Sequence, residues 1–171
     1  MLDKKVFFSL LFLLFLIISC AIGPQIWKLQ QKKIFTIDAK LTEISGIEYD
    51  KKNRLWGIND GGNGAFIHQI SKSGEVTRSI EITNAKNLDW EDMTQDDFGH
   101  FFIGDFGNND NDRKWLTIYK IENPIDIKTD KTSAEIIKFT NPDVIDSNST
   151  DNQHYDLEAF VYFNNKLYLF S

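Results

Sequence analysis

The residues best suited to chemistry in this sequence are pairs of acids whose members stand two positions apart. Asp89 and Glu91 form one pair, and Asp156 and Glu158 form another. Side chains two residues apart lie on the same face of a β-strand, so each pair would present two carboxylates together. Clustered carboxylates repel one another unless a cation neutralises them, and calcium prefers hard oxygen ligands of this kind. The pattern therefore predicts a calcium site.

Glu91 and Glu158 are the expected principal ligands, and residues at equivalent places further along the chain would add oxygens. The full candidate set is Glu91, Glu158, Asp89, Asp156, Asn59 and Asp105. A purely structural interpretation stays open. In that interpretation the acids accept hydrogen bonds from loop N–H groups and hold neighbouring parts of the fold together.

The acid pairs belong to a unit that occurs three times, starting at Glu43, Asp89 and Asp156. Each copy continues with a short apolar run, a polar turn and a second apolar run. The first copy carries Ser45 where the others carry Glu91 and Glu158. A repeat of roughly 40–50 residues built from short strands is typical of a β-propeller blade. Because the first strand of each blade lines the central channel, the repeat would gather the acids around one axis.

The expected fold class is therefore all-β: a partial β-propeller of about two and a half four-stranded blades. The blades are expected over about residues 34–82, 83–141 and 155–171. Alternating or apolar segments predict strands over residues 44–49, 55–59, 65–71, 76–82, 91–95, 101–104, 116–121, 134–139, 157–162 and 166–170. Residues 123–133 and 141–153 are expected to be loops.

The number of blades is too small to close a ring, because propellers have typically 4–8 blades. An open sheet edge also invites aggregation. We therefore expect the chain to be a truncated copy of a longer protein. The alternative is a ring assembled from several chains.

The N-terminal residues predict a secretory signal. Lys4 and Lys5 precede an apolar segment, residues 6–18, that is short for a membrane span of about 20 residues. The following Ile17-Ile18-Ser19-Cys20 resembles the bacterial lipobox, in which the cysteine is lipidated and becomes the mature N-terminus.

This resemblance implies that residues 1–19 are a lipoprotein signal peptide that forms a helix, with Cys20 as the lipidation site and residues 20–33 as a tether. The alternative is an uncleaved signal anchor that extends to Ile22. In either case the expected location is the cell envelope, facing the periplasm or the exterior, with the membrane as a partner.

Charge and cysteine content narrow the function classes. The chain of 171 residues has a formal net charge of −6, which argues against binding to a nucleic-acid backbone, since that needs a basic face. It has a single cysteine, so an internal disulfide is excluded.

The motifs DWEDMTQD, GDFGNN and DLEAF, together with SGIEYD and WGINDGGN, resemble a group of secreted bacterial propellers. That group is allied to the phytase-like esterase domain and, more distantly, to six-bladed calcium-dependent lactonase and gluconolactonase propellers. The resemblance implies a central cation near Glu91 and Glu158, with Asp89 and Asp156 adjacent. Ser45 departs from the pattern, because it replaces an acid.

Two functions follow as hypotheses. One is a membrane-tethered, extracytoplasmic β-propeller lipoprotein that binds an unknown ligand or protein partner on its channel face. The other is a calcium-dependent hydrolase of phosphate or carboxylic esters, in which the metal polarises the substrate.

Overall fold

The computed structural model describes residues 33, 35–140 and 156–171. The chain divides into two units, Met1–Ile34 and Phe35–Ser171, and every strand of the described residues belongs to the second. The predicted signal helix, Cys20 and the predicted loop over residues 141–153 lie outside the described residues. Within the described part, no helix is long and apolar enough to cross a bilayer.

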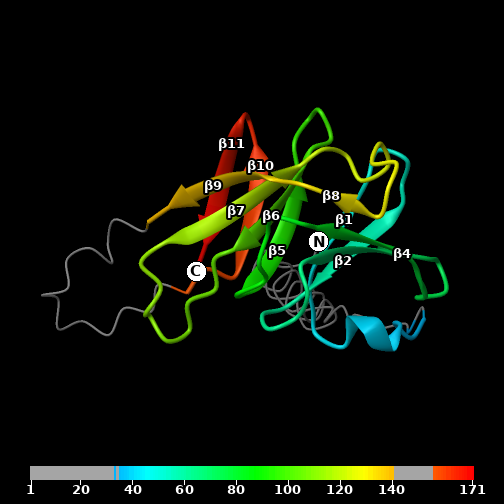
Figure 1. The fold of residues 1–171 in the computed structure, drawn as a ribbon, viewed down its shortest axis with the longest axis horizontal. Helices are drawn as coiled ribbons and strands as arrows, with labels where there is room; N and C mark the ends of the chain where they lie inside the picture. Colours follow the sequence, from blue (N-terminus) through cyan, green and yellow to red (C-terminus); the bar gives the residue numbers. More distant parts are fainter. Residues whose placement is uncertain (1–32, 34, 141–155) are drawn as a thin grey trace, which may run out of the picture. The chain divides into compact units, whose positions relative to one another are not determined.

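The second unit is all-β, as the repeat predicted, and its strands form three sheets (Figure 1). The first sheet begins after a short 3₁₀ helix, η1 (Ala39–Leu41). Its antiparallel strands follow one another in chain order: β1 (Ile44–Tyr49), β2 (Leu55–Asn59), β3 (Phe66–Ile70) and β4 (Val76–Ile82).

The second sheet repeats this order, and the third contains the last two strands. The second sheet consists of β5 (Trp90–Gln95), β6 (Phe101–Asp105), β7 (Leu116–Ile121) and β9 (Glu135–Phe139). The third is the hairpin of β10 (Ala159–Phe163) and β11 (Lys166–Phe170). These bounds agree with the predicted strands to within a few residues.

One strand was not predicted. β8 (Lys131–Thr132) lies in the expected loop over residues 123–133 and pairs in parallel with β4 at the edge of the first sheet. Arg78 holds this segment in place, because its guanidinium donates to the carbonyls of Pro124, Ile127 and Thr129. The loop of the second sheet is thereby fastened to the first sheet.

The hydrophobic core occupies the two spaces between neighbouring sheets. Between the first and second sheets lie fully buried side chains that include Trp56, Ile58, Trp90, Phe101 and Ile103. Between the second and third lies a smaller cluster, in which the Phe106 and Phe160 rings meet edge to face at 5.2 Å between centroids. Because both faces of the second sheet are covered, β6 is buried along its whole length. This explains why its first three residues, Phe101, Phe102 and Ile103, are all apolar instead of alternating with polar residues.

The first strands of the three sheets, β1, β5 and β10, are neighbours. Ser45 Oγ donates a 2.8 Å hydrogen bond to the Trp90 carbonyl, which joins β1 to β5. The Phe160 N–H donates to Asp92 Oδ2 at 3.0 Å, which joins β5 to β10. The approach is close, since a Cβ on Gly46 would lie 2.9 Å from the Asp92 Cα. The acids near the starts of these strands are therefore brought to one end of the assembly.

Equivalent aspartates anchor the turns after β1 and β5. Asp50 accepts hydrogen bonds from the backbone of Lys52 and Arg54 and from the Trp56 indole at 2.9 Å. Asp96 accepts from the backbone of Phe98 and His100 in the same way. Sequence reasoning treated both turns only as polar segments. The shared geometry identifies both aspartates as structural.

Candidate cation site

Three carboxylates from two sheets converge at the starts of the first strands. Asp60 follows β2, Asp89 immediately precedes β5, and Glu91 lies within β5. One oxygen from each lies within 4.8 Å of the others. Such a group of oxygens can hold a hard divalent cation.

Glu91 is positioned by an irregularity in β5. The pairing of β5 with β6 shifts register between Trp90 and Asp92, so Glu91 is the extra residue of a β-bulge. The pairing of β1 with β2 shifts at the equivalent place, between Ile44 and Gly46. A β-bulge changes the direction in which a side chain points. The same backbone irregularity therefore orients Ser45 in the first copy of the repeat and Glu91 in the second.

Two glycines leave room for the carboxylates. A Cβ on Gly107 would lie 2.2 Å from Glu91 Oε1 and 2.4 Å from Asp89 Oδ2. A Cβ on Gly61 would lie 2.8 Å from Asp89 Oδ1. These glycines occupy equivalent positions in the first two copies of the repeat, and each lies beside Asp89. A larger residue at either position would displace the acids.

The negative charges of these acids raise the pKa of their neighbours. Burial, followed by the charges of Asp60, Glu158, Asp89 and Asp156, raises the pKa of Glu91 from 4.5 to about 8. A carboxylate with such a pKa is largely protonated at neutral pH unless a cation stabilises its charged form.

Two further pKa values move in the same direction. Burial and the charge of Asp60 raise the pKa of Asp89, while the Arg113 guanidinium opposes this shift. Burial and the interaction with Asp156 raise the pKa of Glu158. The predicted residues Asp156 and Glu158, which directly precede β10, are thus close enough to the Asp60, Asp89 and Glu91 group to share its field. The Asn108 N–H also donates to Asp156 Oδ1 at 2.6 Å.

The other two predicted ligands, Asp105 and Asn59, differ in whether their side-chain oxygens have protein partners. Asp105 is buried, and its Oδ1 pairs with the Arg113 guanidinium at 2.8 Å and accepts from the Asp89 N–H at 3.0 Å. Asn59 Nδ2 donates to the Lys40 carbonyl at 2.8 Å, while Asn59 Oδ1 has no protein partner. The structure thus brings Asp89 and Glu91 into the group of three and places Asp156 and Glu158 within its field. Asp105 is not a member of that group.

Sequence reasoning missed Asp60, the third member of the group. It stands where the second copy of the repeat has Phe106, so aligning the copies concealed it. The available signal was its position directly after Asn59 and before Gly61, in a loop already expected to adjoin the acids.

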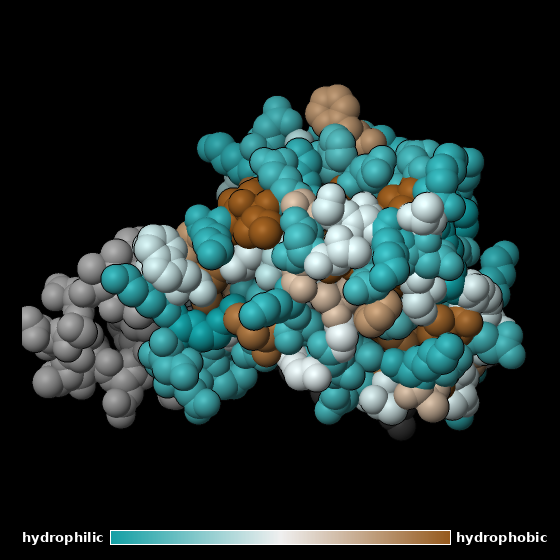
Figure 2. Space-filling model, viewed as in Figure 1, coloured by the Kyte–Doolittle hydropathy of each residue, from teal (hydrophilic) through white to brown (hydrophobic). Residues whose placement is uncertain are grey.

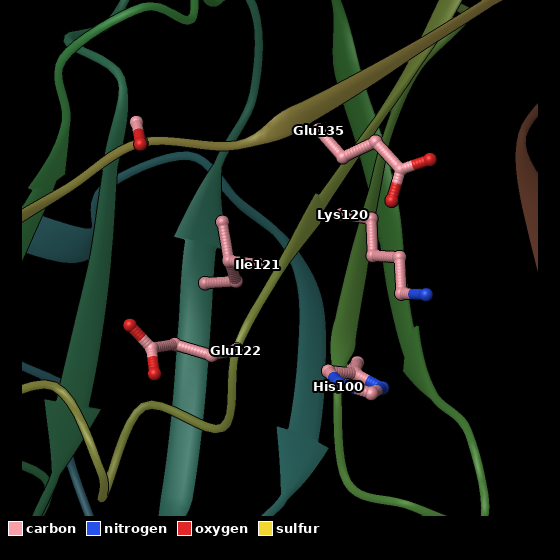
Figure 3. Close-up of a pocket in the computed structure, with 6 residues that line it drawn as sticks. His100, Lys120, Ile121, Glu122 and Glu135 are labelled. Atoms are coloured by element: carbon pink, nitrogen blue, oxygen red, sulfur yellow. The ribbon is translucent and has the colours of Figure 1, made fainter.

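A shallow pocket of about 280 Å³ lies at the other end of the second sheet (Figure 3). The side chains of Glu135, Lys120 and His100 follow one another along one side of it, with Ile121 and Glu122 opposite. His100 Nδ1 lies 2.8 Å from Asp96 Oδ2. The Asp50–Arg54 ion pair occupies the same place in the first copy, so the Asp96–His100 contact is a turn anchor of the repeat.

Comparison of the chain with protein-family models, curated proteins and solved structures finds no match.

Proposed function

We propose that this protein is an extracytoplasmic, membrane-tethered binding protein of β-propeller type whose channel end holds a calcium ion. The single observation that carries the proposal is the convergence of Asp60, Asp89 and Glu91, with ligand oxygens within 4.8 Å of one another. An uncompensated cluster of this kind costs folding free energy, and a bound cation removes that cost.

The propeller assignment is supported by the way the sheets succeed one another. The first four strands of the first sheet and the four strands of the second sheet have the same order, and β5 is adjacent both to β1 and to β10. The β-bulges at Ser45 and Glu91 and the turn anchors at Asp50 and Asp96 also recur at equivalent positions. Blades arranged around one axis account for all of these features.

Calcium is favoured by the chemistry of the donors. The group offers only carboxylate oxygens, whereas zinc sites in proteins usually include cysteine or histidine. The charges of Asp156 and Glu158 act on Glu91, although both residues lie outside the group of three, and they are the proposed source of further oxygens for calcium, which takes six to eight ligands. Gly61 leaves space beside the Asp89 carboxylate, and Gly107 leaves space beside the carboxylates of Asp89 and Glu91.

The test is thermal unfolding of the purified protein in EDTA and in increasing calcium. Calcium should raise the melting temperature, because a ligand at about 100 times its Kd stabilises the folded state by about 2.7 kcal/mol. Combining Glu91→Gln with Glu158→Gln should abolish that rise. Glu122→Gln, an exposed acid at the far pocket, is the matched control and should leave it unchanged.

A melting temperature that responds to neither calcium nor magnesium would overturn the cation site. The same preparations distinguish binding from hydrolysis. Turnover of an aryl ester or a lactone that depends on calcium and on Glu91 would replace the binding role with the hydrolase hypothesis.

A further inference from the structure

The third sheet has one face that no part of the described chain covers. Its side chains are Val161, Phe163, Tyr168 and Phe170, which are 43%, 60%, 43% and 53% exposed. Val161 and Tyr168 are paired across the two strands, and the Phe163 and Tyr168 rings lie 6.5 Å apart. We call these four residues the open face. The view in Figure 2 shows a mainly hydrophilic surface with separate hydrophobic patches, which is the usual arrangement.

The hairpin itself is well anchored by its other face. Phe160 is 4% exposed and packs with Leu167 and Leu169 against the second sheet. The hairpin is therefore apolar on both faces, as β6 is, and β6 is covered on both sides. Strands of this composition are typical of positions buried between two layers.

The chain itself shows what packs against such a face. In the first two sheets, one face packs against the first strand of the sheet that follows in the chain; we call this the forward face and the opposite side the backward face. Asp92 and Thr94 on β5 accept hydrogen bonds from the Phe160 and Tyr162 N–H groups of β10. The equivalent positions on β10 are Ala159 and Val161, so an incoming first strand would run beside them.

The first sheet supplies the matching backward face. Ile47 and Tyr49 of β1 are 57% and 54% exposed. Ile47 is equivalent to Met93 and Phe160, which are only 3% and 4% exposed because each packs against the preceding sheet. The described chain thus carries one unpaired face of each kind.

We propose that the open face of one copy binds the Ile47 and Tyr49 face of a second copy, head to tail. The contact would place β1 of the second copy where β10 lies on β5. Ala159 and Val161 offer no side-chain acceptor like those of Asp92 and Thr94, so apolar burial would stabilise it. Head-to-tail contacts between identical chains generate rings when the rotation closes, as successive blades of a propeller would require. The proposal does not depend on the cation, so the two can fail separately.

Oxidative cross-linking tests the contact directly. Thr94 Oγ1 accepts the Tyr162 N–H at 3.3 Å, so the equivalent pair between copies is Val161 with Tyr49. Two variants of the full chain are made, and both carry Cys20→Ser, which removes the only native thiol. One variant adds Val161→Cys and the other adds Tyr49→Cys. A disulfide forms only where the two Cα atoms lie within about 7 Å, so a cross-link at this pair requires the proposed register. Mixing the two variants under mild oxidation should yield a covalent dimer, several-fold more than either variant alone.

Lys128→Cys replaces Tyr49→Cys in the control mixture, because Lys128 is an exposed residue outside both faces. Cross-linking no stronger than in this control would overturn the proposal, as would a dimer formed equally well by Val161→Cys alone. The latter result would show two open faces packed on each other. Both substituted residues are exposed, and unchanged thermal unfolding of each variant verifies that it folds.

Discussion

Glu91 is the residue on which the electrostatics of the acid group are concentrated. Its pKa is raised by burial and by four neighbouring acids. Burial also raises the pKa of Asp105, but Asp105 has the Arg113 guanidinium as a counterion, whereas no ion pair to Glu91 is found among the described residues. The difference separates a carboxylate that lacks a cation partner from one that the fold already neutralises. It also makes Glu91 the side chain most sensitive to pH and to added metal.

In EDTA, stability should fall as the pH rises from about 4.5 to about 8. Over this range the folded protein holds a proton on Glu91 that the unfolded chain has lost, so raising the pH favours unfolding. The raised pKa values of Asp89 and Glu158 act in the same direction. The loss should be about 1–2 kcal/mol once solvent screening at these partly exposed groups is allowed for.

Melting temperatures measured across this pH range check the prediction. Glu91→Gln should flatten the profile, and saturating calcium should do the same for the unmodified protein. A wild-type profile that rises over the whole interval would contradict the assignment of a raised pKa to Glu91.

Gly107 should be needed for cation binding because of the space it leaves. In Gly107→Ala the new methyl group would meet Glu91 and Asp89 within 2.4 Å, so these carboxylates must move apart. We expect calcium affinity to fall about tenfold, which corresponds to about 1.4 kcal/mol. Isothermal titration calorimetry measures it.

The matched control is Gly62→Asn. Gly62 has φ +80° and no atom within 4 Å of its would-be Cβ, and asparagine tolerates this conformation better than most side chains, as it does at Asn53 and Asn111. Its calcium affinity should match that of the wild type. Equal losses in both variants would mean that the loops, and not the space beside the acids, determine binding.

At the scale of elements, the turn after β1 depends on one buried aspartate. Burial by itself would raise the pKa of Asp50, but hydrogen bonds from Trp56, Arg54 and Lys52 outweigh it and lower the pKa. Its carboxylate thus fixes both the turn and the buried indole at the centre of the first core. The charged form is the one the fold stabilises.

Asp50→Ala should destabilise the protein by about 3 kcal/mol, because it leaves a buried indole N–H and the Arg54 side chain without their acceptor. Asp97→Ala, an exposed aspartate in the equivalent turn, should change stability by less than about 0.5 kcal/mol. Urea unfolding of the two variants makes the comparison. Similar midpoints for both would show that the Asp50 network contributes little.

At the scale of the whole molecule, what could be predicted from sequence was local. Strand positions followed from alternating and apolar runs, because side-chain direction depends on neighbours along the chain. β8 could not be predicted, since contacts with residues distant in sequence, such as Arg78 and Asn84, hold its loop against the first sheet. Asp60 and the Arg113 partner of Asp105 were likewise missed, because both depend on where separate loops end in space.

The cellular location of the protein is predicted by residues outside the described part, above all Cys20. If the cysteine carries lipid, Cys20→Ser should move the protein from the membrane fraction to the soluble fraction and leave the strands intact. Fractionation followed by immunoblotting measures this, and retained palmitate label on the wild type alone identifies the modification. The lipid matters for the proposed function, because a tether holds the cation-binding end near a surface and raises its effective concentration there. A variant that stays membrane-bound at its uncleaved mass would instead establish the signal-anchor alternative.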